Sequence, residues 1–198
     1  MTQVELKKNL GKVDIYLLDQ VMKNRYLETD TILDAGCGKG RNLIFLHNLG
    51  FKIEGCDVDE RTINKLKHNY SNINLSVCEL NNLPYIDNSF NHIICNAVLH
   101  FAENEIHFLK MIDELYRVLK PKGSLFIRMT SIFGLENLVI KKEEQYLLPD
   151  GTNRFLLSLN HISKLKEKFT FIAPLKTVNV NNLRCMSTLV LQKNHLSL

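Results

Sequence analysis

The sequence predicts an α/β fold built on a doubly wound sheet of about seven strands, mostly parallel, with helices on both faces. Short apolar runs alternate with helical segments along most of the chain, and this order is typical of parallel strands joined by crossover helices. Near the C-terminus, two apolar runs joined by a short turn have to pair antiparallel, because a parallel crossover needs about a dozen residues or more. A chain of 198 residues predicts one domain over residues 1–198.

The elements of the first half follow from apolar spacing and turn signals. Residues 4–24 have apolar side chains at helical spacing and predict one amphipathic helix, which we regard as a candidate lid over residues 1–25. Five further elements are expected: a strand at 31–35, a helix from about 40 to 49 stopped by Gly50, a strand at 51–56, a helix beginning at 59 or 60, and a strand at 74–78.

The second half begins with a strand expected at 91–97 and the clearest amphipathic helix, which Pro121 ends. A fifth strand is expected at 124–129, and it completes a core over residues 28–130. Residues 132–157 show no clear period, and we interpret them as an insertion on the substrate side. The remaining residues, 158–198, predict a helix at about 158–168 and two strands, 169–179 and 184–192, that turn at Asn181-Asn182.

Composition narrows the function classes. The net charge of +4 is spread among acidic residues without a basic stripe, so nucleic acid is not an expected partner. No apolar run is long enough to span a membrane. The five cysteines form no CxxC pair, which argues against a zinc site. Their odd number, and the lack of a signal-peptide pattern, lead us to expect a cytoplasmic protein.

The segment from Asp34 to Asn42 carries the main functional signal. A short apolar strand ends in Asp34, a loop with glycines at 36, 38 and 40 follows, and a helix then begins. A glycine loop of this kind lets backbone N–H groups and a helix N-terminus approach a ligand closely. The other predicted strands end in Asp57, Glu79 and Asn96, which should meet at one edge of a parallel sheet.

Asp57 and the glycine spacing indicate what the ligand is. Asp57 lies 21 residues after Gly36, where an acidic side chain can accept hydrogen bonds from both ribose hydroxyls. The alternative role, a cap for the next helix, fits Asp59 better, because Asp57 directly continues the strand. A dinucleotide fingerprint G-x-G-x-x-G would need its third glycine at position 41, which is Arg41. The pattern therefore disfavours a nicotinamide dehydrogenase.

Several segments taken together resemble the class I S-adenosylmethionine-dependent methyltransferases of the type 11/25 kind, with their Rossmann-like fold. The matching segments are residues 33–40 (LDAGCGKG), 55–58 (GCDV), 79–90 (ELNNLPYIDNSF), 97–101 (AVLHF) and 117–123 (RVLKPKG). Residues 40–42 and 49–51 also resemble the tellurite-resistance and thiopurine-type small-molecule methyltransferases. The family pattern is broken at Asn91, where Asp is frequent, and at Lys122, where Gly is frequent.

The resemblance implies a cofactor and the residues that bind it. S-adenosyl-L-methionine would lie with its methionine part against the glycine loop and near Asp34, its ribose on Asp57 and its adenine amino group on Glu79. The backbone N–H of Leu80 would contact the adenine ring, and Asn96 would face the sulfonium. The cofactor-binding set is Asp34, Gly36, Cys37, Gly38, Gly40, Asp57, Val58, Glu79, Leu80 and Asn96.

The chemistry of methyl transfer does not identify the methyl acceptor. Methyl transfer needs an aligned nucleophile, and it needs a base only when that nucleophile holds a proton at neutral pH. His100 is the candidate general base, although packing at a helix start is the interpretation we favour. Tyr16, Arg128 and Arg184 are candidates for binding the substrate.

We therefore expect a cytoplasmic methyltransferase that acts on a small molecule. One alternative is a regulatory module that binds the cofactor without catalysis, and another is a methyltransferase for protein or RNA. The RNA alternative lacks a basic patch, and Asn96 is followed by Ala97 rather than by an Asn-Pro-Pro-Tyr-type motif. No metal is expected.

Overall fold

The structure is a computed structural model that describes residues 2–194. The strands of its main sheet are β1 (Thr31–Ala35), β2 (Lys52–Asp57), β3 (Leu75–Val77), β4 (Phe90–Asn96), β5 (Leu119–Ser131), β9 (Phe169–Phe171), β10 (Lys176–Val180) and β11 (Arg184–Lys193). A small second sheet consists of β6 (Ile140–Lys142), β7 (Gln145–Leu147) and β8 (Asn153–Arg154). The helices are α1 (Gln3–Leu10), α2 (Ile15–Met22), α3 (Arg41–Asn48), α4 (Glu60–Asn69), the 3-10 turn η1 (Leu99–Phe101), α5 (Glu105–Val118) and α6 (Leu159–Lys168).

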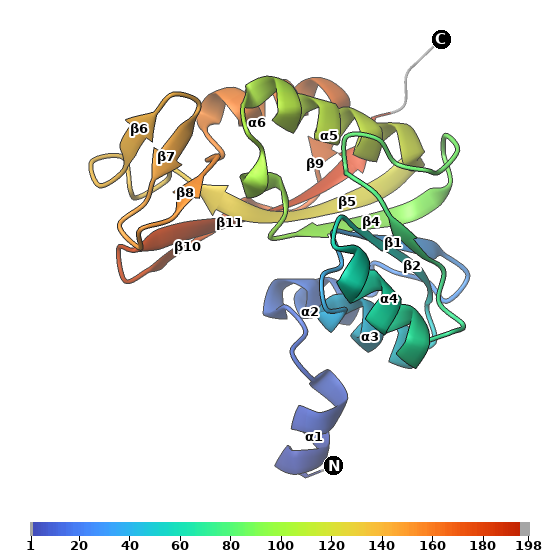
Figure 1. Cartoon of the computed structure of the whole chain (residues 1–198). Coiled ribbons are helices and arrows are strands. Elements are labelled where there is room, and N and C mark those ends of the chain that lie inside the picture. The colour runs from blue at the N-terminus through green and yellow to red at the C-terminus, as the bar shows by residue number, and fades with distance from the viewer. Residues whose placement is uncertain (1, 195–198) are drawn as a thin grey trace.

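The main sheet has the order β10-β11-β5-β4-β1-β2-β3, with β9 paired to the end of β11 (Figure 1). Strands β5, β4, β1, β2 and β3 are parallel, whereas β11 runs antiparallel to its neighbours. The prediction of a mostly parallel sheet with one antiparallel strand near the C-terminus is confirmed. The strand order reverses between β1 and β4, and open parallel sheets bind ligands beyond the strand ends at such a point.

Helices cover both faces of the sheet, as predicted. On one face, α5 and α6 pack into a core that includes Phe108, Leu115 and Leu165. On the other, α2, α3 and α4 pack into a second core that includes Leu17 and Leu43 (Figure 1). Because helices cover both faces of the sheet, the middle parts of β1, β4 and β5 are buried and largely apolar, and polar side chains lie toward the strand ends.

The N-terminal segment differs from the single helix expected over residues 4–24. The chain breaks at Gly11, which has a φ of +57°, and Asp14 starts α2 by accepting a hydrogen bond from the backbone N–H of Tyr16. Helix α1 buries none of its residues and extends away from the body of the protein (Figure 1). The apolar spacing was continuous, but the glycine and the N-cap divide the segment in two.

Three further boundaries differ from the sequence expectations. Residues 132–157, where no regular element was expected, contain the sheet of β6, β7 and β8. The strand expected over 169–179 is two strands, β9 and β10, because Pro174 lies in the break between them. Strand β5 is longer than expected, since α5 ends at Val118 before Pro121 is reached.

Other expectations are met in the described part of the chain. The hairpin of β10 and β11 is antiparallel, and both of its turn residues, Asn181 and Asn182, have a positive φ. All five cysteines are free. Within residues 2–194, no helix combines the length and the apolar character that a membrane crossing requires.

Candidate functional site

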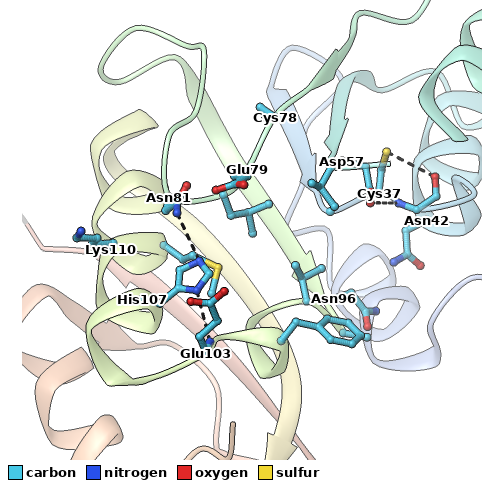
Figure 2. A pocket seen from close by; sticks show the side chains of 18 of the residues that line it. Cys37, Asn42, Asp57, Cys78, Glu79, Asn81, Asn96, Glu103, His107 and Lys110 are labelled. Atoms are coloured by element: carbon cyan, nitrogen blue, oxygen red, sulfur yellow. Dashed lines mark hydrogen bonds between the residues drawn. The ribbon is translucent and has the colours of Figure 1, made fainter. Parts of the chain in front are cut away.

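A cavity of about 1190 Å³ opens at the carboxyl ends of the parallel strands (Figure 2). One part of its wall is the glycine loop after β1 together with Asp57 and Val58 after β2. Residues 78–81 after β3 and residues 96–98 after β4 form the middle, and the first turns of α5 close the far side. The cavity therefore lies where the strand order reverses, which is where a fold of this kind is expected to bind a ligand.

The glycine loop approaches neighbouring elements too closely for most side chains. Gly36 has a φ of +77°, and a Cβ atom there would lie 2.3 Å from Cγ2 of Val98. Gly40, at the N-cap of α3, has a φ of +80°, and a Cβ atom would lie 3.0 Å from Leu66. The positive φ favours glycine at both positions, and at Gly36 the space requires it as well; residues 36–39 line the cavity, whereas Gly40 does not.

Asp57 ties the glycine loop to the end of β2. Its Oδ2 accepts a hydrogen bond from the backbone N–H of Gly38 at 2.8 Å, and its Oδ1 accepts one from the N–H of Asp59 at 3.0 Å. A carboxylate has about four lone-pair sites, so these two bonds leave room for two ligand hydroxyl groups. Asp59 instead caps α4, because its side chain accepts hydrogen bonds from the backbone N–H groups of Arg61 and Thr62. The capping role considered for this region therefore belongs to Asp59.

Glu79 lies in the middle of the cavity wall, between Asp57 and α5 (Figure 2). Its side chain is exposed, and its carboxylate makes no hydrogen bond with other residues in the described part of the chain. Leu80 and Val58 line the cavity on either side, the first buried and the second exposed. This arrangement offers a carboxylate beside two apolar surfaces, which suits a flat ring that carries an amino group.

Asp34 is buried behind the loop and does not line the cavity. It is 1% exposed, and neither carboxylate oxygen has a hydrogen-bond partner within residues 2–194. Burial raises the pKa of Asp34 to about 7, which the nearby Leu43 amide, outside regular hydrogen-bond geometry, and the Arg41 guanidinium oppose only in part. A buried carboxylate with no partner is costly, so this group fits an ammonium ligand or a water molecule that bridges to one.

Asn96, at the end of β4, lines the cavity and belongs to a polar cluster. Its Oδ1 accepts a hydrogen bond from Nη2 of Arg41 at 2.9 Å. Oδ2 of Asp14 lies 3.7 Å from Nη2 of Arg41 and 3.3 Å from Nη1 of Arg128. The Arg128 guanidinium also lies 5.0 Å from the centre of the Tyr16 ring. The structure thus brings two predicted substrate residues, Tyr16 and Arg128, together beside Asn96 rather than into the cavity itself.

His100 and Arg184 lie farther from the cavity. His100 is 6% exposed, packs against Phe101 in a tilted arrangement with ring centres 4.5 Å apart, and does not line the cavity. Burial lowers the pKa of His100 to about 4, helped by the charges of Arg154 and Arg184. Arg184 is exposed at the start of β11. The geometry therefore keeps His100 neutral and packed behind Phe101.

Polar side chains at the start of α5 also line the cavity, although the sequence pattern did not predict them. His107 accepts a hydrogen bond at Nδ1 from the N–H of Glu103 at 3.4 Å, and its Nε2 lies 3.5 Å from Nδ2 of Asn81 (Figure 2). Lys110 lines the same end of the cavity. No signal identified these residues, because their helix reads from sequence as an ordinary amphipathic one. Arg41 and Asp14 were missed as well, since their contacts join distant segments.

The polar groups at the cavity suit an organic ligand. Within residues 2–194, no group of three or more His, Cys, Asp or Glu side chains is arranged to hold a metal ion. The cavity offers a backbone cradle at Gly36 and the carboxylates of Asp57 and Glu79, and the buried carboxylate of Asp34 lies behind the loop. These groups match the hydroxyl, amino and ammonium donors of an adenosine that carries an amino-acid tail.

Comparisons with known proteins agree with this match. A family described as a methyltransferase domain matches residues 33–127. An uncharacterized methyltransferase of Bacillus subtilis is 34% identical over 98 residues, 48% of this chain and 40% of its own length. A tRNA (carboxymethyluridine(34)-5-O)-methyltransferase of Arabidopsis thaliana is 38% identical over 96 residues, 48% of this chain and 23% of its own length. The matched regions thus span less than half of either relative.

The fold also matches solved structures. The crystal structure of an S-adenosylmethionine-dependent methyltransferase from Methanosarcina mazei superposes with a TM-score of 0.73, covering 88% of this chain and 97% of that one. The identity is 21%, so this likeness concerns the fold. The superposition extends well beyond residues 33–127, which means that the N-terminal and C-terminal segments also follow the shared architecture.

Proposed function

We propose that this chain, which belongs to the class I S-adenosylmethionine-dependent methyltransferases and has S-adenosyl-L-methionine as its cofactor, transfers a methyl group to a small-molecule acceptor. The observation that carries the proposal is the size and lining of the cavity. Small-molecule sites usually measure about 300–1,000 Å³. A cavity of about 1190 Å³ has room for the cofactor and a small acceptor side by side.

The proposed cofactor contacts follow the strand ends. Asp57 accepts hydrogen bonds from the ribose hydroxyls while it holds the Gly38 N–H. Glu79 accepts from the adenine amino group, and Leu80 and Val58 cover the ring. The buried carboxylate of Asp34 balances the ammonium group of the amino-acid tail. The remaining proposed contacts are with the glycine loop at Gly36, Cys37, Gly38 and Gly40.

The protein's part in the reaction is alignment and exclusion of water. When bound, the cofactor supplies an electrophilic methyl group on a sulfonium. Asn96, at the buried end of β4, would lie beside that group, and the side chains of Val98 and Phe101, which also line the cavity, would shield it from water. His100 has a lowered pKa and lies outside the cavity, so we do not propose it as a base that acts on the acceptor. The five free cysteines fit the proposed cytoplasmic location.

A second candidate acceptor is RNA, because one relative is a tRNA methyltransferase. The net charge of +4 is low for a protein that binds RNA, and the exposed Lys and Arg side chains alternate with acidic ones. We therefore rank a small acceptor above RNA, and a regulatory module without catalysis below both.

A methyl-transfer screen tests the proposal. The protein is incubated with S-adenosylmethionine and each of a panel of thiols, chalcogen oxyanions, carboxylates, phenols, amines and bulk tRNA, and release of S-adenosylhomocysteine is measured. We expect release above the acceptor-free level with at least one small molecule. Release with tRNA alone would replace the small acceptor by RNA. If the protein binds the cofactor but releases no S-adenosylhomocysteine with any acceptor, the regulatory module becomes the favoured function.

A further inference from the structure

One wall of the cavity is formed by η1 and the first turns of α5, and none of the cofactor contacts proposed above uses it. Its lining residues include Phe101, Glu103, Asn104, Ile106, His107 and Lys110. Asn96 lies between this wall and the glycine loop (Figure 2). Because Asn96 is proposed to face the sulfonium, a methyl acceptor would lie against this wall.

Two large apolar side chains of this wall are exposed. Phe101 is 59% exposed and Ile106 is 69% exposed, and both line the cavity. Apolar surface in contact with water is unfavourable, and an apolar ligand that covers it gains the free energy of its removal from water. Small-molecule sites are lined mainly by such side chains, with a few polar groups that fix the orientation of the ligand. The wall therefore suits a ligand with an apolar body.

Contacts with neighbouring segments hold the exposed ring of Phe101 in place. The Arg154 guanidinium, on β8, lies 4.8 Å from the centre of the ring, and His100 packs against it with ring centres 4.5 Å apart. The turn that carries the ring is tied to β7, because the carbonyl of Ala102 accepts a hydrogen bond from Nε2 of Gln145 at 2.8 Å. An aromatic side chain held in this way loses little conformational entropy when a ligand packs on it.

Most polar side chains of this wall are already engaged. Asn104 caps α5 by accepting a hydrogen bond from the backbone N–H of His107 at 2.8 Å. His107 accepts at Nδ1 from the N–H of Glu103 at 3.4 Å, so its Nε2 holds the proton and faces the Asn81 amide at 3.5 Å. Lys110 lies at the end of the wall that is farther from the glycine loop (Figure 2).

The carboxylate of Glu103 remains for a ligand. Glu103 is exposed, lines the cavity beside His107 and follows Phe101 by two positions (Figure 2). Its backbone N–H donates to His107, but in the described part of the chain its carboxylate has no hydrogen bond or ion pair. An ionised carboxylate only accepts hydrogen bonds, and it bonds most strongly to a cationic donor. The ligand group that suits this position is therefore an amine in its protonated form.

We propose that Phe101, Glu103 and Ile106 form an acceptor subsite that selects an amine on an apolar, ring-sized body. The ring packs on Phe101 and Ile106, and the N–H groups of the amine donate to Glu103. This inference rests on the proposed function, because it narrows the small-molecule acceptor to one chemical class. Lys110 would favour the opposite charge on the ligand, and the test below distinguishes the two.

Calorimetric titration of three probes into protein saturated with S-adenosylhomocysteine tests the proposal. Benzylamine carries both the ring and the cationic amine, methylamine lacks the ring, and benzoate has a carboxylate in place of the amine. The wild type is compared with Glu103→Gln, which removes the charge and keeps the shape, and with Phe101→Ala and Ile106→Ser, which remove apolar surface. Glu167→Gln, at an exposed position on α6 outside the cavity, is the matched control.

We expect the wild type to bind benzylamine about tenfold more tightly than methylamine or benzoate. Glu103→Gln should weaken benzylamine about tenfold and should not weaken benzoate. Phe101→Ala and Ile106→Ser should each weaken benzylamine by roughly threefold or more, because apolar contact is lost. All three variants should bind S-adenosylhomocysteine as the wild type does, and Glu167→Gln should change nothing.

Other results overturn the proposal. Tighter binding of benzoate than of benzylamine would assign the wall to an anionic acceptor, and binding of none of the probes would remove the subsite. Unchanged affinity for benzylamine in Glu103→Gln would remove the role of the carboxylate, and equal affinities for methylamine and benzylamine would remove that of the apolar surface. Weaker S-adenosylhomocysteine binding in Glu103→Gln would place Glu103 against the cofactor. If the wild type bound no S-adenosylhomocysteine, the failure would instead concern the proposed function.

Discussion

Polar groups at the two ends of the central sheet differ in whether they have hydrogen-bond partners. At the carboxyl end, charged or amide atoms without a partner in the described part of the chain occur in Asp34, Asn96 and Arg128. At the amino end, by contrast, the buried and half-buried side chains of Lys193, Arg117 and His92 are hydrogen-bonded. Lys193, for example, is 8% exposed and donates to Oδ1 of Asn88 and to the carbonyls of Tyr116 and Leu119.

Two more groups at the amino end follow the same rule. Arg117 bonds the carboxylates of Glu114 and Asp87 and two backbone carbonyls. His92 bridges Ser124 and Asp30, at 2.7 and 2.9 Å. The Tyr26 hydroxyl is an exception at this end, but it is neutral.

This difference distinguishes the polar groups that stabilise the fold from those that are available to bind a ligand. A buried polar group without a partner lowers stability, so a fold keeps such groups where a ligand completes them. Fully bonded groups at the amino end, by contrast, serve the fold. Changes at the amino end should therefore affect stability, and changes at the carboxyl end should affect binding.

The largest expected effect is at the amino end. Lys193→Met removes a charged donor from three acceptors, of which the Leu119 carbonyl is buried, and we expect the free energy of unfolding to fall by about 4 kcal/mol. Affinity for S-adenosylhomocysteine should stay within a factor of two. Lys65→Met, at an exposed position on α4, is the control and should cost less than about 0.5 kcal/mol. A large loss of affinity in a folded Lys193→Met protein would contradict the view that changes at the amino end affect stability and not binding.

The glycine loop gives the next effect. Gly36 and Gly38 both have a positive φ, but only at Gly36 would a Cβ atom meet a neighbour, Val98 at 2.3 Å. We expect Gly36→Ala to cost about 2 kcal/mol more stability than Gly38→Ala. Equilibrium denaturation of both variants measures the difference, and equal costs would show that Val98 moves aside freely.

His100 predicts a dependence of stability on pH. Burial lowers its pKa from about 6.5 to about 4, so between pH 7 and pH 5 the unfolded chain takes up a proton that the folded chain does not. This group alone should therefore lower stability by about 2 kcal/mol over that interval. Asp34, with its raised pKa, acts in the opposite direction, because the folded state takes up its proton.

The difference between wild type and His100→Gln isolates the histidine, since Asp34 is common to both proteins. Unfolding free energies at pH 7 and pH 5 should show the wild type losing about 2 kcal/mol more than the variant. Equal losses would mean that His100 is accessible to protons in the folded protein.

The smallest effect concerns neighbouring acids at the carboxyl end. Asp57→Ala removes the acceptor that faces the cavity and should weaken S-adenosylhomocysteine at least tenfold, about 1.4 kcal/mol. Asp59→Ala removes only the cap of α4 and should cost about 1 kcal/mol of stability without changing affinity. Calorimetry and denaturation of both variants provide the test. Unchanged affinity in a folded Asp57→Ala protein would remove the ribose role.

The sequence predicted features that depend on residues close together along the chain, and it missed contacts between residues that are far apart in the sequence. The glycine loop and Asp57 depend on spacing along the chain, so their arrangement at one edge could be predicted. Asp14 and Arg128 are 114 positions apart in the sequence and meet only through the fold. His107 was missed because a polar residue on an amphipathic helix reads as part of its exposed face. The hairpins of residues 132–157 lack the alternation that marks longer strands.

The most direct test of the central claim, that the unpaired groups at the carboxyl end form a cofactor site, is calorimetric titration of the wild type. We expect S-adenosylhomocysteine to bind with a Kd on the order of micromolar and NADH not to bind. Binding of NADH with no heat from S-adenosylhomocysteine, or no binding of either, would contradict the account.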